Sequence, residues 1–174
     1  MKPREPVEAP GVVIRPERPG DEKAIHALHA AAFPSPSEAG LVDALREAGA
    51  ATLSVVAVVD GVIAGHVLLS PVSIDGVLGL APIGVLPELQ KRGIGAALMR
   101  HALEQARQQG AGAVVLLGDP AYYRRFGFLP AREFGLRCKW PGAEEAFMAL
   151  ELRPGALKGR AGLVSYHPAF ERFE

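Results

Sequence analysis

The most constraining stretch of this sequence is a strand, a short polar loop and a long helix that follow one another directly. Residues 78–86, LGLAPIGVL, are apolar and end before a proline, and residues 92–109 carry apolar side chains at helical spacing. Gly93 and Gly95 stand where this helix begins, although glycine weakens a helix. We therefore expect this turn to bring backbone amides close to a ligand.

The first turn of a helix carries N–H groups without partners and a partial positive charge, so it suits an anion. Lys91 and Arg92 add charge beside the two glycines, and the loop thus predicts a pyrophosphate site. Two known phosphate motifs do not fit. A P-loop needs lysine and Ser/Thr after its last glycine, where this chain has Ala96 and Ala97. A dinucleotide loop needs glycine or alanine where Leu98 stands, which disfavours an oxidoreductase.

The rest of the chain predicts a mixed α/β fold. Two β-branched runs within residues 51–74 flank Asp60-Gly61, a pair suited to a type I′ hairpin turn. Residues 113–118, AVVLLG, form a short apolar strand of the kind buried in parallel sheets. Helices are expected over residues 20–33 (with Asp21 as a capping residue), 37–49 and 119–126, further strands over residues 12–19, 133–140 and 144–152, and a packed, irregular tail from Pro154.

Length and composition limit the classes of protein. At 174 residues we expect a single domain, with residues 1–11 as a flexible lead-in. Nineteen basic residues balance nineteen acidic ones, so net charge gives no reason to expect nucleic acid or membrane binding. No apolar run reaches the ~20 residues of a membrane span, and residues 1–11 lack the apolar core of a secretory signal. With one cysteine, Cys138, we expect a cytoplasmic protein.

Two short motifs resemble one known family. Gln90 to Gly95 reads Q-x-x-G-x-G, which resembles the acyl-CoA pyrophosphate loop of the GNAT superfamily of N-acetyltransferases. The run YYRRFGF, residues 122–128, resembles the Y-x-x-x-G-F signature of that family, with Tyr123 in the tyrosine position. The similarity spans about residues 76–130 and is nearest to the predicted acetyltransferases of the YhbS type. It implies a mixed, mostly antiparallel sheet with a splayed parallel strand pair, flanked by helices.

The resemblance also implies where acetyl-CoA, as co-substrate, would bind. Pantetheine would lie along the backbone of Ile83 and Val85, beside the strand interruption that Pro82 and Gly84 predict. The residues expected to hold the pyrophosphate are Gln90, Lys91, Arg92, Gly93, Ile94, Gly95 and Ala96.

The implied reaction is direct transfer of the acetyl group to a primary amine of a small molecule or a peptide, by a monomer or homodimer. Tyr123 would protonate the departing thiolate, and the Val85 N–H would stabilise the oxyanion. Packing in the core is the alternative role for Tyr123, and packing is the interpretation for Tyr122. Arg124 and Arg125 are interpreted as surface charges or as contacts to the CoA 3′-phosphate.

A general base is not visible in the sequence. The strand before the loop has no carboxylate, so a water relay or another segment must serve, or the protein is a non-catalytic acyl-CoA-binding module. Asp119 is interpreted as a helix N-cap. The following strand, VVLLG, lacks the asparagine that many relatives carry there.

The remaining reactive side chains predict no further site. His26 and His29, on one amphipathic helix, are interpreted as surface residues, and no metal site is expected. Cys138 has no basic partner in the sequence and is not expected to be a nucleophile. Residues 35–49 and 140–151 are the expected walls of the acceptor site, with packing favoured for Trp140 itself.

Overall fold

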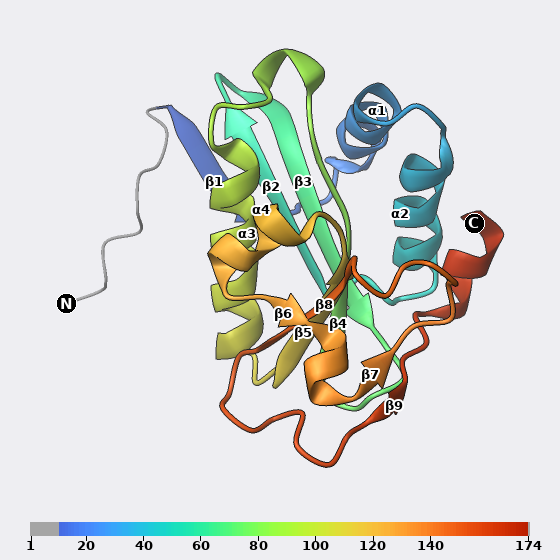
Figure 1. Cartoon of the computed structure of the whole chain (residues 1–174). Coiled ribbons are helices and arrows are strands. Elements are labelled where there is room, and N and C mark those ends of the chain that lie inside the picture. The colour runs from blue at the N-terminus through green and yellow to red at the C-terminus, as the bar shows by residue number, and fades with distance from the viewer. Residues whose placement is uncertain (1–10, 174) are drawn as a thin grey trace.

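The computed structural model describes residues 11–173, so the predicted lead-in lies outside the described residues except for Gly11. A mixed sheet crosses the molecule (Figure 1), and its seven strands run in the order β1-β2-β3-β4-β5-β8-β6. All neighbouring strands are antiparallel except the parallel pair β4–β5, which confirms the predicted fold class. The strands are β1 Val12–Pro16, β2 Leu53–Val59, β3 Val62–Pro71, β4 Val77–Val85, β5 Ala113–Leu117, β6 Leu129–Pro130 and β8 Phe147–Glu151.

Helices cover both faces of this sheet. Helices α1, Glu22–Ala32, and α2, Ser37–Glu47, lie on one face, and α3, Ile94–Gln108, lies on the other (Figure 1). The alternation of β2 explains this arrangement, because Val55 packs in the cluster under α3 while Val56 packs with Ile25 and Val42 of the opposite helices. The predicted helices and the break at the prolines between α1 and α2 are confirmed.

The capping role expected of Asp21 differs in the structure. Asp21 precedes α1, but its carboxylate caps no helix N–H. It accepts instead from the Arg18 N–H at 2.8 Å and from the Arg15 guanidinium at 2.7 Å. The ion pair with Arg15 and the bond from the Arg18 N–H therefore satisfy the carboxylate in place of a capping bond.

The hairpin of β2 and β3 forms at the predicted turn. Asp60 and Gly61 both have positive φ, at 50° and 77°. Two consecutive residues with positive φ are what a type I′ turn requires, and its twist matches that of the two strands.

Helix α3 packs unusually close to β3. A Cβ added at Gly65 would lie 2.8 Å from Leu98 Cδ1 and 3.1 Å from Ile94 Cγ2. The missing side chain therefore lets the first turns of α3 lie directly on the sheet, which fixes the position of the helix start.

The C-terminal part departs most from the prediction. The prediction of a strand over residues 133–140 was wrong for most of that range. A 3-10 turn, Ala131–Phe134, is followed by a strand of only two residues, β7, Leu136–Arg137. β7 pairs with a second short strand, β9, Gly162–Leu163. The tail then ends in a 3-10 segment, Pro168–Phe173, whose Phe173 packs against Gly40 of α2. These contacts join segments distant in sequence, which local patterns do not report.

Candidate active site

The parallel strands β4 and β5 separate halfway along β4. Their pairing ends at Gly79 opposite Val115, although β4 continues to Val85. On its other side β4 stays paired with β3, up to Val85 opposite Gly65. Within the described strands, the β5-facing edge of β4 is thus unpaired over residues 80–85, which includes the predicted pantetheine positions Ile83 and Val85. An open strand edge offers amide and carbonyl groups to an extended ligand.

Pro82 lies at the irregular part of β4. The register of β3 against β4 shifts between Val67 and Leu69, opposite residues 80–83. Proline has no N–H to donate, so it interrupts a ladder, as the sequence predicted.

The loop after β4 has a strained backbone conformation. A short 3-10 turn, Pro87–Leu89, leads into it, and the Gln90 side-chain amide donates to the Val85 carbonyl at 3.0 Å. Lys91 and Gly93 then adopt positive φ, at 64° and 84°. A positive φ costs a residue with a Cβ about 1–2 kcal/mol. Left-handed residues in a loop turn successive N–H groups toward a common point, which is a common anion-binding arrangement.

Helix α3 starts directly at this loop. Gly93 is its N-cap, and the first of its backbone bonds runs from the Ala97 N–H to the Gly93 carbonyl at 3.0 Å. The N–H groups of Ile94, Gly95 and Ala96 precede that bond and have no carbonyl one turn earlier in the helix. With the exposed side chains of Lys91 and Arg92 beside them, all seven predicted pyrophosphate residues gather at one end of the open strand.

Tyr123 lies at the end of β5, on the far side of the opening. Helix α4, Pro120–Tyr123, is capped by Asp119, whose carboxylate accepts from the Ala121 N–H at 3.0 Å, as predicted. The Tyr123 ring lies against Gly118, where an added Cβ would be 3.2 Å from Cζ. Burial raises the pKa of Tyr123 above its usual value, and the neighbouring Tyr122 and Asp119 raise it further. The phenol therefore keeps its proton at neutral pH.

Tyr122 points at the phosphate loop. Its hydroxyl lies 3.5 Å from the position that a Cβ on Gly95 would take, and the Arg125 guanidinium lies 4.6 Å from its ring centroid. The sequence suggested packing for Tyr122, and for Arg125 either a surface charge or a contact to the CoA 3′-phosphate. The structure places both beside the start of α3.

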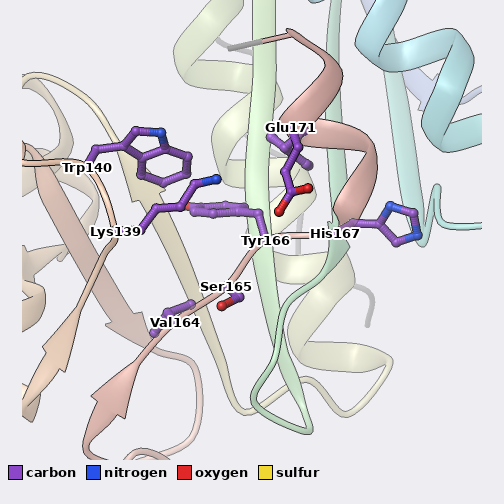
Figure 2. Close-up of a pocket in the computed structure, with 8 residues that line it drawn as sticks. Lys139, Trp140, Val164, Ser165, Tyr166, His167 and Glu171 are labelled. Carbon is purple, nitrogen blue, oxygen red and sulfur yellow. The ribbon is translucent and has the colours of Figure 1, made fainter.

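A small open pocket lies on the α2 side of the sheet. Figure 2 shows the Trp140 and Tyr166 rings beside the Lys139 side chain, with the Glu171 carboxylate directed toward Tyr166. The Tyr166 ring contacts β4 at Gly79, the residue where β4 and β5 part. Trp140 was an expected wall of the acceptor site, but most of the other lining residues come from the C-terminal tail, where the sequence shows no functional motif.

His29 is the clearest error of the sequence analysis. It was interpreted as a surface residue, yet His29 is fully buried, whereas His26 on the same helix is exposed and pairs with Asp43 at 2.7 Å. His29 lies four residues after the buried Ile25, so helical spacing assigned it to the inner face. Its Nε2 lies 2.8 Å from Nδ1 of His66, also fully buried.

The Cys138 thiol donates to the Trp140 carbonyl at 3.8 Å. Within residues 11–173, no three or more His, Cys, Asp or Glu side chains group as metal ligands would. No helix in that same part of the chain is long and apolar enough to cross a bilayer.

Comparison with known proteins agrees with this geometry. The model of the Acetyltransferase (GNAT) family matches residues 22–128. The uncharacterised N-acetyltransferase YhbS of Escherichia coli is 44% identical over 167 residues, which cover 93% of this chain and 100% of YhbS. The crystal structure of that protein in complex with CoA superimposes with a TM-score of 0.91 over 95% of both chains, at 43% identity. A GNAT acetyltransferase from Brucella melitensis, in complex with acetyl-CoA, gives a TM-score of 0.78 at 41% identity over 91% of this chain and 97% of that one.

Proposed function

Since the chain belongs to the GNAT family of acetyltransferases, we propose that it transfers the acetyl group of acetyl-CoA directly to a primary amine. The observation that carries this proposal is the opening between β4 and β5, which leads straight to the unpaired amides at the start of α3. The two relatives whose structures hold CoA and acetyl-CoA support the choice of co-substrate.

The coenzyme would lie along one continuous set of backbone groups. The free edge of β4 at Ile83 and Val85 suits the two amides of pantetheine, because an extended chain can pair there as a further strand. The loop from Gln90 to Ala96 suits the pyrophosphate, since the N–H groups at the helix start favour an anion. Lys91 and Arg92 add two positive charges at the same place.

The chemistry requires three groups around the thioester. As the amine nitrogen attacks the carbonyl carbon, a C–N bond forms and negative charge develops on the oxygen, where the Val85 N–H would donate. When the C–S bond breaks, its electron pair stays on sulfur and the thiolate takes a proton from Tyr123. The hydroxyl of the partly buried Tyr123 is suited to this step because its raised pKa keeps the acid form available.

The acceptor would approach from the α2 side of the sheet. The pocket of Trp140, Tyr166 and Glu171 adjoins β4 where the strands part, and aromatic walls with a carboxylate suit a molecule that carries an amine. Small-molecule amines and peptide amines both satisfy this description.

One observation favours a second candidate, a non-catalytic acyl-CoA-binding module. β4 carries no ionisable side chain that could deprotonate the acceptor. Retention of Tyr123 beside the opening argues for turnover instead.

Calorimetry and a turnover assay test both candidates. Isothermal titration with CoA and acetyl-CoA should register binding of both, and a thiol reagent should detect free CoA when acetyl-CoA is mixed with suitable members of a panel of primary amines. Binding without thiol release on any amine would support the module. Absence of binding to either coenzyme would refute the proposed function.

A further inference from the structure

A chain of hydrogen bonds crosses the protein beneath α1. His29 Nε2 lies 2.8 Å from His66 Nδ1, and His66 Nε2 lies 2.8 Å from the Ser54 hydroxyl. The Ser54 hydroxyl donates to a carboxylate oxygen of Glu17 at 2.8 Å. Glu17 in turn pairs with the Arg46 guanidinium at 2.7 Å.

The carboxylate sets the direction of every bond in this chain. An ionised carboxylate only accepts, so the single hydroxyl hydrogen of Ser54 points to Glu17. Ser54 can then only accept from His66, which places the His66 proton on Nε2. Burial lowers the pKa of His66 well below its usual value, so the ring is neutral and its Nδ1 accepts from His29 Nε2–H.

Nδ1 of His29 carries a lone pair without a proton. Burial also lowers the pKa of His29, to about 4, so this ring is neutral and its one proton is on Nε2. Nδ1 is therefore an acceptor, and it is buried without a hydrogen-bond partner. A buried polar atom without a partner costs about 1–3 kcal/mol and is rare enough to suggest a function.

This lone pair lies against the open half of β4. A Cβ added at Gly84 would lie 2.9 Å from His29 Nδ1, so only glycine lets the imidazole approach the strand this closely. Gly84 stands between Ile83 and Val85, the two residues whose backbone is proposed to hold the thioester end of the coenzyme. The partly buried ring of Phe33 stacks on His29 and reaches the same point, 3.2 Å from that Cβ position. Access to Nδ1 requires Phe33 to turn aside.

We propose that Nδ1 of His29 is the general base of the transfer, and that His66, Ser54 and Glu17 are positioning residues that hold it in the reactive tautomer. This inference rests on the proposed function, since it names the base that β4 itself lacks. The arrangement is a histidine oriented through its second nitrogen by a distant carboxylate.

The proton balance of the step is simple. The acceptor nitrogen becomes strongly acidic as its bond to the carbonyl carbon forms, and its proton passes to His29 Nδ1. The resulting imidazolium keeps its Nε2–H bond to His66, and the negative charge of Glu17 at the far end favours it. Tyr123 gives its own proton to the thiolate, and both residues return to their resting forms by exchange with solvent after the products leave.

The charges around His29 keep it neutral at rest. Burial has the largest effect and lowers the pKa of His29, His26 on the same helix lowers it further, and Asp43 of α2 raises it by less. From β3 it faces neutral His66, and the pair of Glu17 and Arg46 lies beyond. The base is therefore unprotonated at any pH well above 4.

The tautomer can be measured without an acceptor. Long-range ¹H–¹⁵N correlation spectra of the ¹⁵N-labelled protein should show a protonated Nε2 and a bare Nδ1 for His29 between pH 5.5 and 8, with the signals assigned by their loss in His29→Gln. In Glu17→Gln the direction is no longer fixed, so a second tautomer should appear. A proton on Nδ1 of His29 in the wild-type protein would refute the inference.

Kinetics test the role of the base. The His29→Gln side chain can still donate to His66 but has no basic atom, so kcat with acetyl-CoA and the best amine of the panel should fall about 10²-fold or more at pH 7. The affinity for CoA should not change. The deficit should shrink as the pH rises, because hydroxide can then take the same proton from the attacking nitrogen, whereas a purely structural defect would be equal at every pH. His26→Gln, on the same helix, is the matched control and should retain wild-type turnover.

These outcomes separate the two proposals. An active wild-type protein whose His29→Gln variant turns over within about twofold of it at pH 7 refutes the base and leaves the proposed function intact. If the wild-type protein binds no coenzyme, the proposed function fails at the calorimetric step, before any variant is compared.

Discussion

Replacing Gly93 or Gly95 by alanine should change the thermal stability in opposite directions. Both replacements should weaken the binding of CoA. Gly95 is the second residue of α3, and an added Cβ would meet the Tyr122 hydroxyl at an ordinary 3.5 Å. Alanine is more stable than glycine in a helix by about 0.5–1 kcal/mol, so Gly95→Ala should raise Tm by about 1–4 °C. Gly93 has φ of 84°, where a Cβ costs about 1–2 kcal/mol, so Gly93→Ala should lower Tm by about 2–8 °C.

Both variants should bind CoA more weakly. A methyl group at either position stands where the phosphate must approach the backbone, and a hydrogen bond to a charged group contributes about 1.5–3 kcal/mol. Loss of one such bond corresponds to about a 10–150-fold increase in Kd. Calorimetric titration with CoA and thermal unfolding of the free proteins measure the two quantities separately.

Gly110→Ala is the control for strain alone. Gly110 follows the other end of α3 and has φ of 90° with open space around it, so its replacement should cost stability as Gly93→Ala does, without changing the Kd for CoA. A Gly95→Ala protein that is more stable than wild type and binds CoA equally well would show that the start of α3 does not hold the phosphate.

Three further predictions concern turnover, packing and pH. Tyr123→Phe should lower kcat about 10²–10⁴-fold while the Kd for CoA stays constant, and unchanged turnover would remove Tyr123 as the acid. Gly118→Ala should place a Cβ 2.2 Å from Tyr123 Cε2 and displace the ring, so denaturant unfolding should show a loss of about 1–3 kcal/mol together with reduced kcat. The unfolded chain takes up a proton at His29 near pH 6.5 but the folded protein only near 4, so the contribution of His29 to stability is complete above pH 6.5 and should fall by about 1.4 kcal/mol per pH unit between pH 6.5 and 4. His29→Gln should reduce that slope, and an equal slope in both proteins would contradict the lowered pKa.

The parts of the fold that could be predicted are those fixed by neighbours in sequence. The hairpin at Asp60-Gly61 follows from a two-residue turn, and the helix start at Gly93 follows from a strand, a polar loop and a periodic apolar run. The parallel strand 113–118 was recognisable because a strand buried on both faces is apolar at every position. The placement of the predicted loop residues beside the open end of β4 follows from that same order of elements.

The parts that could not be predicted depend on contacts between distant segments. Residues 133–140 have the composition of a strand, but β7 is short because its partner comes from residues 162–163. Tyr166 enters the pocket only because the tail returns to β4 at Gly79. His29 and His66 are 37 positions apart, and no local pattern connects them.

For His29, the helical spacing and the usual surface preference of histidine predict opposite positions. Ile25, Leu28 and His29 share one face of α1, and the spacing alone assigned all three to the inside. The surface interpretation followed the usual preference of histidine. A buried imidazole needs a hydrogen-bond partner, and the sequence did not reveal one. His66 supplies that partner from the middle of strand β3.

Gly65 has a practical consequence for anyone who engineers this protein. Gly65 contacts no proposed ligand, yet it determines how closely α3 packs on β3. That packing distance sets the position of the first backbone amides of the helix. A larger side chain at Gly65 would push α3 away from the sheet. The amides at the start of α3 would then move, and the affinity for the coenzyme should fall although Gly65 itself does not contact it. A mutational screen scored by coenzyme affinity would therefore flag Gly65 beside the loop residues, and libraries meant to alter acceptor choice should leave it untouched.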